Sequence, residues 1–319
     1  MHRTSFFKDM PPFAKLMVSV SFVLLSLILF SGLSIVLSVL IYPVKLNVLL
    51  DPLNNIKEPG VLDSLNLMQT ISGIGIFIIP AFVLAYLMSD NIFAFLKLNH
   101  RAALISFLLV AVMMLSMLPF INWLVEMNSR MVLPPFMHGI EEWMRKSEDD
   151  NAELTKYFLD MHSMKSMLFN VLMIALIPAI GEELLFRGIL QRLFIEWTKN
   201  KHIGIWVTAA LFSAIHLQFY GFVPRMLLGI LFGYLVVWSG SLWLPILGHF
   251  MNNASAVVFT YLFQNEISKI DPDKIGTTHT QWITTLISFV MMVGIMLFIR
   301  KIEKGKVATE ESEIPTELP

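Results

Sequence analysis

Three short motifs in the second half of the chain bring together side chains that could hydrolyse a bond. They are Glu182 and Glu183 followed by Arg187, Phe212 followed by His216, and His249 followed by Asn253. A carboxylate assisted by a histidine can take a proton from water. A second histidine and an amide can donate hydrogen bonds to the oxyanion that forms at an attacked carbonyl. These residue types therefore predict a hydrolytic site, and no cysteine competes for the role of nucleophile.

The first motif supplies two carboxylates with different surroundings. On a helix, Glu183 and Arg187 are four residues apart and lie on one face, so they can form an ion pair. Glu182 points about 100° away from that face and is left free to act as an acid or base. Pro178 and Gly181 would kink the helix and swing both glutamates toward the centre of the fold. The alternative is that this segment is the cytoplasmic end of a helix, with its charges already in water.

The two histidine motifs also have simpler explanations. A single histidine on an apolar helix, such as His216, is often a hydrogen-bonded residue at a helix interface. His249 and Asn253 share one helix face and could form a polar clamp between helices. Each motif alone is weak, and it is their combination on neighbouring segments that favours a site.

The elements that position these groups must be membrane-spanning helices. Hydrophobic residues make up 56% of the 319 residues without counting glycine, and charged residues make up 15%. Soluble domains have about 45–50% apolar residues with glycine included and about 25% charged residues. This composition excludes a disordered, fibrous, nucleic-acid-binding or ordinary cytosolic protein. The absence of cysteine excludes disulfides and thiolate metal sites.

Apolar stretches of about 20 residues cross a bilayer as helices. The sequence predicts an all-α, polytopic transmembrane helical bundle of about eight spans, at residues 16–42, 65–88, 102–125, 167–197, 203–218, 224–238, 242–263 and 282–299. Lysine and arginine residues cluster at the span ends on the side that holds both termini, so both termini are expected in the cytoplasm. The expected location is the bacterial cytoplasmic (inner) membrane.

Three regions are expected along the chain. Residues 1–163 form an N-terminal three-span region with an amphipathic outer loop, residues 164–306 form the catalytic core with spans 4 to 8, and residues 307–319 form a disordered acidic tail. The outer loop carries one apolar stripe at Phe136, Ile140 and Trp143 or Met144, and another at Leu154, Phe158 and Met161. These stripes predict a helical hairpin that rests on the bundle or serves as a lid.

Together the motifs EExxxR, FxxxH and HxxxN resemble those of the CPBP intramembrane proteases, the CAAX prenyl protease and bacteriocin-processing (Abi) family. The resemblance covers about residues 165–265, with all three motifs intact. It implies an endopeptidase that hydrolyses CAAX-type or other membrane-associated peptides or proteins within the lipid bilayer.

The resemblance also implies a role for each matching residue. Glu182 would be the general base and His216 would help to hold the attacking water. His249 and Asn253 would form the oxyanion hole. Glu183, Arg187 and Phe212 would support the shape of the site.

Zinc is the alternative to a mechanism without a cofactor. Glu182, His216 and His249 could supply three ligands and leave the fourth position of a catalytic zinc open. If Glu182 binds zinc, the best candidate for the base is lost. His249 also cannot bind zinc and donate a hydrogen bond to the oxyanion through the same nitrogen. A mechanism without a cofactor is therefore favoured.

Two other functions stay open. A proton-coupled transporter would more often show repeated halves, and the chain has no visible repeat. A bacteriocin immunity protein could have the same fold without turnover. No nucleic-acid partner is expected, because the net charge is −1.

Overall fold

Each of the eight predicted segments contains a helix in the computed structural model, which describes residues 5–277 and 281–312. The first half contains α1 (Pro12–Ile41), α4 (Val61–Gly73) continuing through η1 (Ile74–Ile78) into α5 (Ile79–Met88), α7 (Leu104–Ser116) and α8 (Leu118–Ser129). The second half contains a continuous run from α10 (Met164–Asn170) to α12 (Gln191–Thr198), then α13 (Lys201–Ala214), α14 (Phe222–Ser239), α15 (Trp243–Gln264) and α16 (Trp282–Ser312). Since the described residues form helices and no strand, the all-α bundle is confirmed.

The number of spans is smaller when it is judged by length and composition alone. Among the described residues, five helices are long and apolar enough to cross a membrane, and the bent pair α7 and α8 makes a sixth if it is one span. Helix α13 has 14 residues, fewer than the roughly 20 that a crossing needs. Helix α15 has 22 residues, but its polar side chains His249, Asn252 and Asn253 reduce its hydropathy. A polytopic membrane bundle is therefore established, whereas the count of eight is not confirmed.

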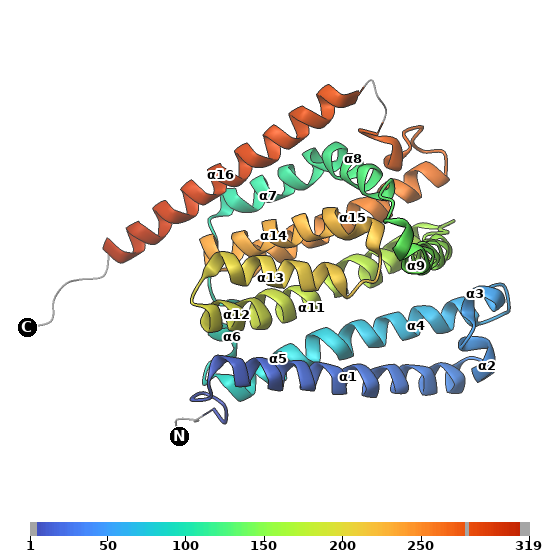
Figure 1. Cartoon of the computed structure of the whole chain (residues 1–319), viewed down its shortest axis with the longest axis horizontal. Helices are drawn as coiled ribbons and strands as arrows, with labels where there is room; N and C mark the ends of the chain where they lie inside the picture. Colours follow the sequence, from blue (N-terminus) through green and yellow to red (C-terminus); the bar gives the residue numbers. More distant parts are fainter. Residues whose placement is uncertain (1–4, 278–280, 313–319) are drawn as a thin grey trace, which may run out of the picture.

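The helices are arranged as an elongated stack in which the second half of the chain is central (Figure 1). Helices α1, α4 and α5 pack together along one edge, and α7, α8 and α16 lie along the opposite edge. Between them are α11 (Ile177–Glu183), α13, α14 and α15. The helices with the polar motifs are thus shielded on both sides by apolar helices.

The outer loop differs from the predicted hairpin. Its main element is a single helix, α9 (His138–Phe158), which runs across one end of the bundle and is seen end-on in Figure 1. The middle residues of the two apolar stripes are therefore parts of one amphipathic helix, whereas Phe136 lies in η2 and Met161 lies beyond the end of α9. Short helices complete the connections: α2 (Leu46–Leu49), α3 (Pro52–Asn55), α6 (Ile92–Phe95), η2 (Pro135–Met137), η5 (Phe219–Gly221) and η6 (Pro272–Lys274).

The helix that carries Glu182 is continuous from Met164 to Thr198, so Pro178 and Gly181 do not end it. Instead, two wider π-helical segments flank α11, namely η3 (Val171–Leu176) and η4 (Leu184–Leu190). At the end of η3 the Ile177 N–H donates to Leu172 O, five residues back, directly before Pro178. The π-helical turn accommodates the proline without ending the helix.

Gly181 allows this helix to approach the η1 segment closely. A Cβ at position 181 would lie 2.8 Å from the Phe77 Cβ, which is closer than two carbon atoms pack.

The division of the chain into three regions, with boundaries at residues 163 and 306, stays a prediction. Helix α16 continues to Ser312, and residues 313–319 of the predicted tail lie outside the described residues.

Candidate active site

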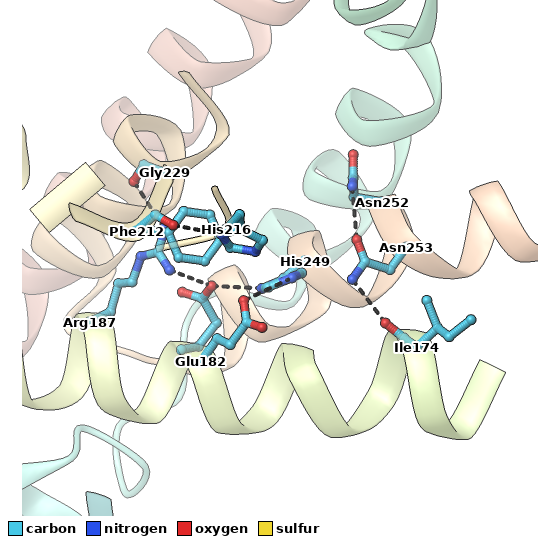
Figure 2. A network of polar contacts seen from close by, with 10 residues as sticks. Ile174, Glu182, Arg187, Phe212, His216, Gly229, His249, Asn252 and Asn253 are labelled. Carbon is cyan, nitrogen blue, oxygen red and sulfur yellow. Dashed lines mark hydrogen bonds and ion pairs between the residues drawn. The ribbon is translucent and has the colours of Figure 1, made fainter. Parts of the chain in front are cut away.

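The structure gathers the three motifs around one cavity of about 510 Å³ in the central layer. Glu182, Phe212, His216, His249 and Asn253 all line this cavity. The two other predicted residues, Glu183 and Arg187, are buried and form an ion pair with each other. Figure 2 shows Arg187 in the polar network of the site. The alternative, in which the charges of this segment lie in water at a helix end, therefore does not hold, because Glu182, Glu183 and Arg187 are buried.

Glu183 is the hub of the network behind the cavity. Its Oε1 accepts a hydrogen bond from Arg187 Nη1 at 2.8 Å and another from His249 Nδ1 at 2.9 Å. The Glu183 and Arg187 side chains are both 0% exposed. The predicted ion pair is therefore present, and the same carboxylate also orients the histidine of the third motif.

Glu182 faces the cavity beside this hub. Its Oε2 lies 3.9 Å from His249 Nε2, and the residue is 9% exposed. Because His249 Nδ1 is committed to Glu183, Nε2 is the ring nitrogen that faces Glu182 and the cavity. This arrangement separates one structural carboxylate from one carboxylate that can reach a bound molecule.

His216 is in a turn and not on a helix, because α13 ends at Ala214. Its Nδ1 is 2.7 Å from the Phe212 carbonyl oxygen. A carbonyl can only accept, so Nδ1 carries the proton and Nε2 is the nitrogen with a free lone pair. The prediction of a helical His216 is wrong, but the backbone still fixes its ring.

The Phe212 ring joins the motifs by packing. Its centroid is 5.1 Å from the His216 ring and 6.0 Å from the His249 ring, both edge-to-face. The Arg187 guanidinium lies 4.5 Å from the same ring centroid, within the range of a cation–π contact. One aromatic side chain therefore sets the spacing of two histidines and an arginine.

Asn253 is held by a carbonyl that Pro178 leaves without its usual partner. Proline has no N–H for the carbonyl four residues earlier, which is Ile174. The Asn253 Nδ2 from α15 donates to Ile174 O at 3.0 Å, as Figure 2 shows. Asn252 Nδ2 donates to Asn253 Oδ1 at 3.0 Å, so the amide of Asn253 is oriented from both ends.

The turn at residues 215–221, which carries His216, is attached to α8 and α9. Asn128 Nδ2 of α8 donates to Phe219 O at 3.0 Å, and Ser147 Oγ of α9 donates to Leu217 O at 3.0 Å. Glu148 Oε2 of α9 accepts from Tyr220 N at 3.2 Å. Thr155 of α9 and Leu159, directly after its end, also line the cavity. The outer helix is therefore part of the site's frame.

The zinc alternative is not supported by the ligand geometry. Among the described residues, no group of three or more His, Asp or Glu side chains is arranged to hold a metal ion. Glu182 and His249 approach each other, but His216 does not complete a ligand set with them. No step of the mechanism is therefore assigned to a metal.

The sequence analysis gave no role to Arg225 or Asn252, which are among the polar residues of the cavity wall. Arg225 lines the cavity from the first turn of α14, and Asn252 lines it from α15. The available signal for Arg225 was its position as a lone charged residue in the predicted span at residues 224–238. Asn252 could not be distinguished from an ordinary neighbour of Asn253 without its contact.

Comparison with known proteins agrees with this geometry. A family model described as "Type II CAAX prenyl endopeptidase Rce1-like" matches residues 164–255, which contain all three motifs. Residues 164–255 are thus similar to an Rce1-like endopeptidase. The resemblance found in the motifs is confirmed over this segment, and the several apolar helices make the protein an integral membrane protein.

A curated relative shares part of the sequence. The chain is 28% identical over 120 residues to the uncharacterized protein YpbD of Bacillus subtilis, and this match covers 36% of the chain. The chain spans 57% of the length of that relative. No solved structure matches the chain.

Proposed function

We propose that the protein is an intramembrane endopeptidase in which Glu182 activates a water molecule. The observation that carries this proposal is the buried Glu182 carboxylate, which faces a cavity with its Oε2 3.9 Å from His249 Nε2. The Rce1-like match over the same residues supports a CAAX-type or other membrane-associated peptide as the substrate class.

In the proposed reaction, Glu182 takes a proton from a water whose oxygen attacks the peptide carbonyl carbon. His216 Nε2 helps to hold that water. The carbonyl becomes an oxyanion, which accepts hydrogen bonds from His249 Nε2–H and the Asn253 amide. The carbon–nitrogen bond then breaks, and Glu182 returns the proton to the leaving amine.

The charges of the network suit this role for His249. Its Nε2 is a donor when both ring nitrogens carry a proton. In that state the imidazolium and Arg187 balance the charges of Glu182 and Glu183. A group of four ionised side chains with no net charge is less costly to bury than an unbalanced one.

The test is a comparison of the wild type with Glu182→Gln. Cleavage by the purified variant should fall by at least ~10²-fold, which is the lower end of the contribution of an acid–base group. Comparative membrane proteomics of cells with either protein should then reveal peptides that stop being cut. Full activity of the variant would exclude Glu182 as the base.

A chelation experiment separates this mechanism from the zinc alternative. Activity of the purified wild type should survive a zinc chelator. Loss of activity with the chelator and its recovery on adding zinc would replace the glutamate mechanism with a metal-dependent one.

A further inference from the structure

Arg225 is a positively charged side chain in the wall of the cavity that holds Glu182 and His216. It lies in the first turn of α14, and the residues that follow it up to Ser239 are uncharged. An ionisable group in a membrane-spanning segment is costly and usually serves the function of the protein.

The guanidinium of Arg225 has only neutral hydrogen-bond partners. Its Nη2 donates to Gln218 Oε1 at 2.7 Å and its Nη1 to Gln218 O at 3.4 Å. In the part of the chain that the structure describes, no carboxylate lies within ion-pair distance of it. Arg187, in contrast, is 2.8 Å from the Glu183 carboxylate.

More distant carboxylates attract Arg225 without contacting it. Glu148 of α9 and Glu182 both interact with its charge across the site. These two carboxylates favour a positive charge at this place. They do not reach the guanidinium, so its N–H donors have no anionic acceptor. An arginine in this situation is prepared for a carboxylate, which it can bind through two parallel hydrogen bonds.

The position of Arg225 relates such a carboxylate to the reacting bond. Gln218, which holds the guanidinium, belongs to the same turn as His216. A cavity of about 510 Å³ is within the range of roughly 300–1,000 Å³ that encloses small ligands, so it holds only a short peptide segment. A carboxylate bound at Arg225 must therefore be close in sequence to the bond attacked near Glu182.

We propose that Arg225 selects the substrate by binding a peptide carboxylate close to the bond that is cut. This inference rests on the proposed endopeptidase function. The carboxylate can come from the free C-terminus of a peptide that is cut near its end, or from an Asp or Glu side chain of the substrate. Arg225 is then the residue that decides where in a peptide the enzyme cuts.

The test uses synthetic decapeptide pools that differ in their carboxylates. One pool has free C-termini, a second has C-terminal amides, and a third has free C-termini but contains no Asp or Glu. Purified protein in lipid nanodiscs cuts each pool, and mass spectrometry reports the rate and the position of the cuts. If the terminal carboxylate is bound, the wild type should cut the first and third pools at least ~10-fold faster than the amide pool, as expected for one charge-assisted hydrogen bond. If a side chain supplies the carboxylate, the third pool should be slow and the amide pool fast.

Two variants test the residue itself. Arg225→Gln removes the charge, and Gln218→Glu places a competing carboxylate where Oε1 is now 2.7 Å from Nη2. In both variants, the rate of cutting the pools with the bound carboxylate, divided by the rate for the pool without it, should fall to about 1. The matched control is Arg192→Gln, because Arg192 bonds to Glu196 outside the cavity, and it should keep the preference.

The proposal is overturned if the wild type cuts all pools at the same rate, or if Arg225→Gln keeps the preference. It is also overturned if Arg192→Gln loses the preference as strongly as Arg225→Gln. If the wild type cuts no pool, the proposed endopeptidase function fails on its own. Retention of the same pools on immobilised Glu182→Gln protein then decides about Arg225, with stronger retention of the carboxylate pool supporting the binding site and equal retention excluding it.

Discussion

Two adjacent glutamates in this site have different surroundings and are expected to have separate tasks. Glu183 is fully buried and accepts from Arg187 and His249, whereas Glu182 faces the cavity. The Glu183 Oε2 atom is buried and has no hydrogen-bond partner among the described residues. Both hydrogen bonds, from Arg187 and from His249, therefore go to Oε1 of this carboxylate.

This difference predicts different effects of the same substitution. Glu183→Gln keeps the shape of the side chain but leaves the Arg187 guanidinium uncompensated in an apolar interior, which costs up to about 3–5 kcal/mol when one partner of a buried pair is removed. We expect lower thermal stability together with lost cleavage, measured by unfolding in detergent and by peptide turnover. Glu182→Gln is the matched control and should lose cleavage with a smaller loss of stability, because Glu182 faces the cavity and Arg187 keeps its bond to Glu183. Equal stability of the two variants would contradict the hub role of Glu183.

At the scale of elements, the helix from α10 to α12 positions groups by interrupting its own hydrogen-bond pattern. The π-helical segments η3 and η4 lie on both sides of the glutamates. Pro178 frees the Ile174 carbonyl, and Asn253 of α15 takes it. A missing bond in one helix therefore determines the orientation of an amide in another.

Substitution of the proline tests this link. Pro178→Ala restores an N–H that can bond to Ile174 O, so Asn253 should lose its acceptor and its orientation. We expect Pro178→Ala to fold normally and to have a lower kcat. The decrease in kcat should be smaller than the roughly 10²–10³-fold decrease expected for Asn253→Ala, which removes the oxyanion donor itself. Pro80→Ala is the control, because Pro80 follows the π-helical segment η1 in the same way but lies outside the cavity. A comparable decrease in both proline variants would refute the link.

The sequence predicts the parts of this fold that depend on local spacing. Long apolar runs give the helices, and a separation of four residues gives the Glu183–Arg187 pair. The bond from Glu183 to His249 joins residues 66 positions apart, and no local rule specifies it. The end of α13 before His216 depends on the anchoring of the turn by α8 and α9, which helix periodicity does not contain. Arg225 was overlooked because the count of apolar residues outweighed one charge.

At the scale of the whole molecule, α1 begins and α16 ends at the same end of the bundle, whereas α9 crosses the opposite end (Figure 1). This arrangement agrees with an even number of passes through the membrane. Together with the basic residues at the span ends, it supports the proposal that both termini are in the cytoplasm and α9 is outside.

Cysteine labelling can test this topology directly, because the chain has no cysteine. Single cysteines can replace Asp9 before α1, Lys304 on α16 and Lys146 on α9, which are all exposed. In intact cells a membrane-impermeant maleimide should label only Lys146→Cys. Asp9→Cys and Lys304→Cys should become reactive after the membrane is permeabilised. Labelling of these two positions from opposite sides would require an odd number of crossings.

The distance along the chain between Glu183 and His249 has a consequence for biosynthesis. The ribosome adds residues at about 5–20 per second, so His249, which is 66 positions after Glu183, is added roughly 3–13 s later. During this interval the glutamates are already in the nascent chain, and Arg187, only four residues away, can neutralise Glu183 as soon as the helix forms. The histidine that completes the network arrives last, with α15. Under the proposed function, a newly made chain therefore has no complete site, and cannot cut its own unfolded segments, until most of the bundle has been inserted.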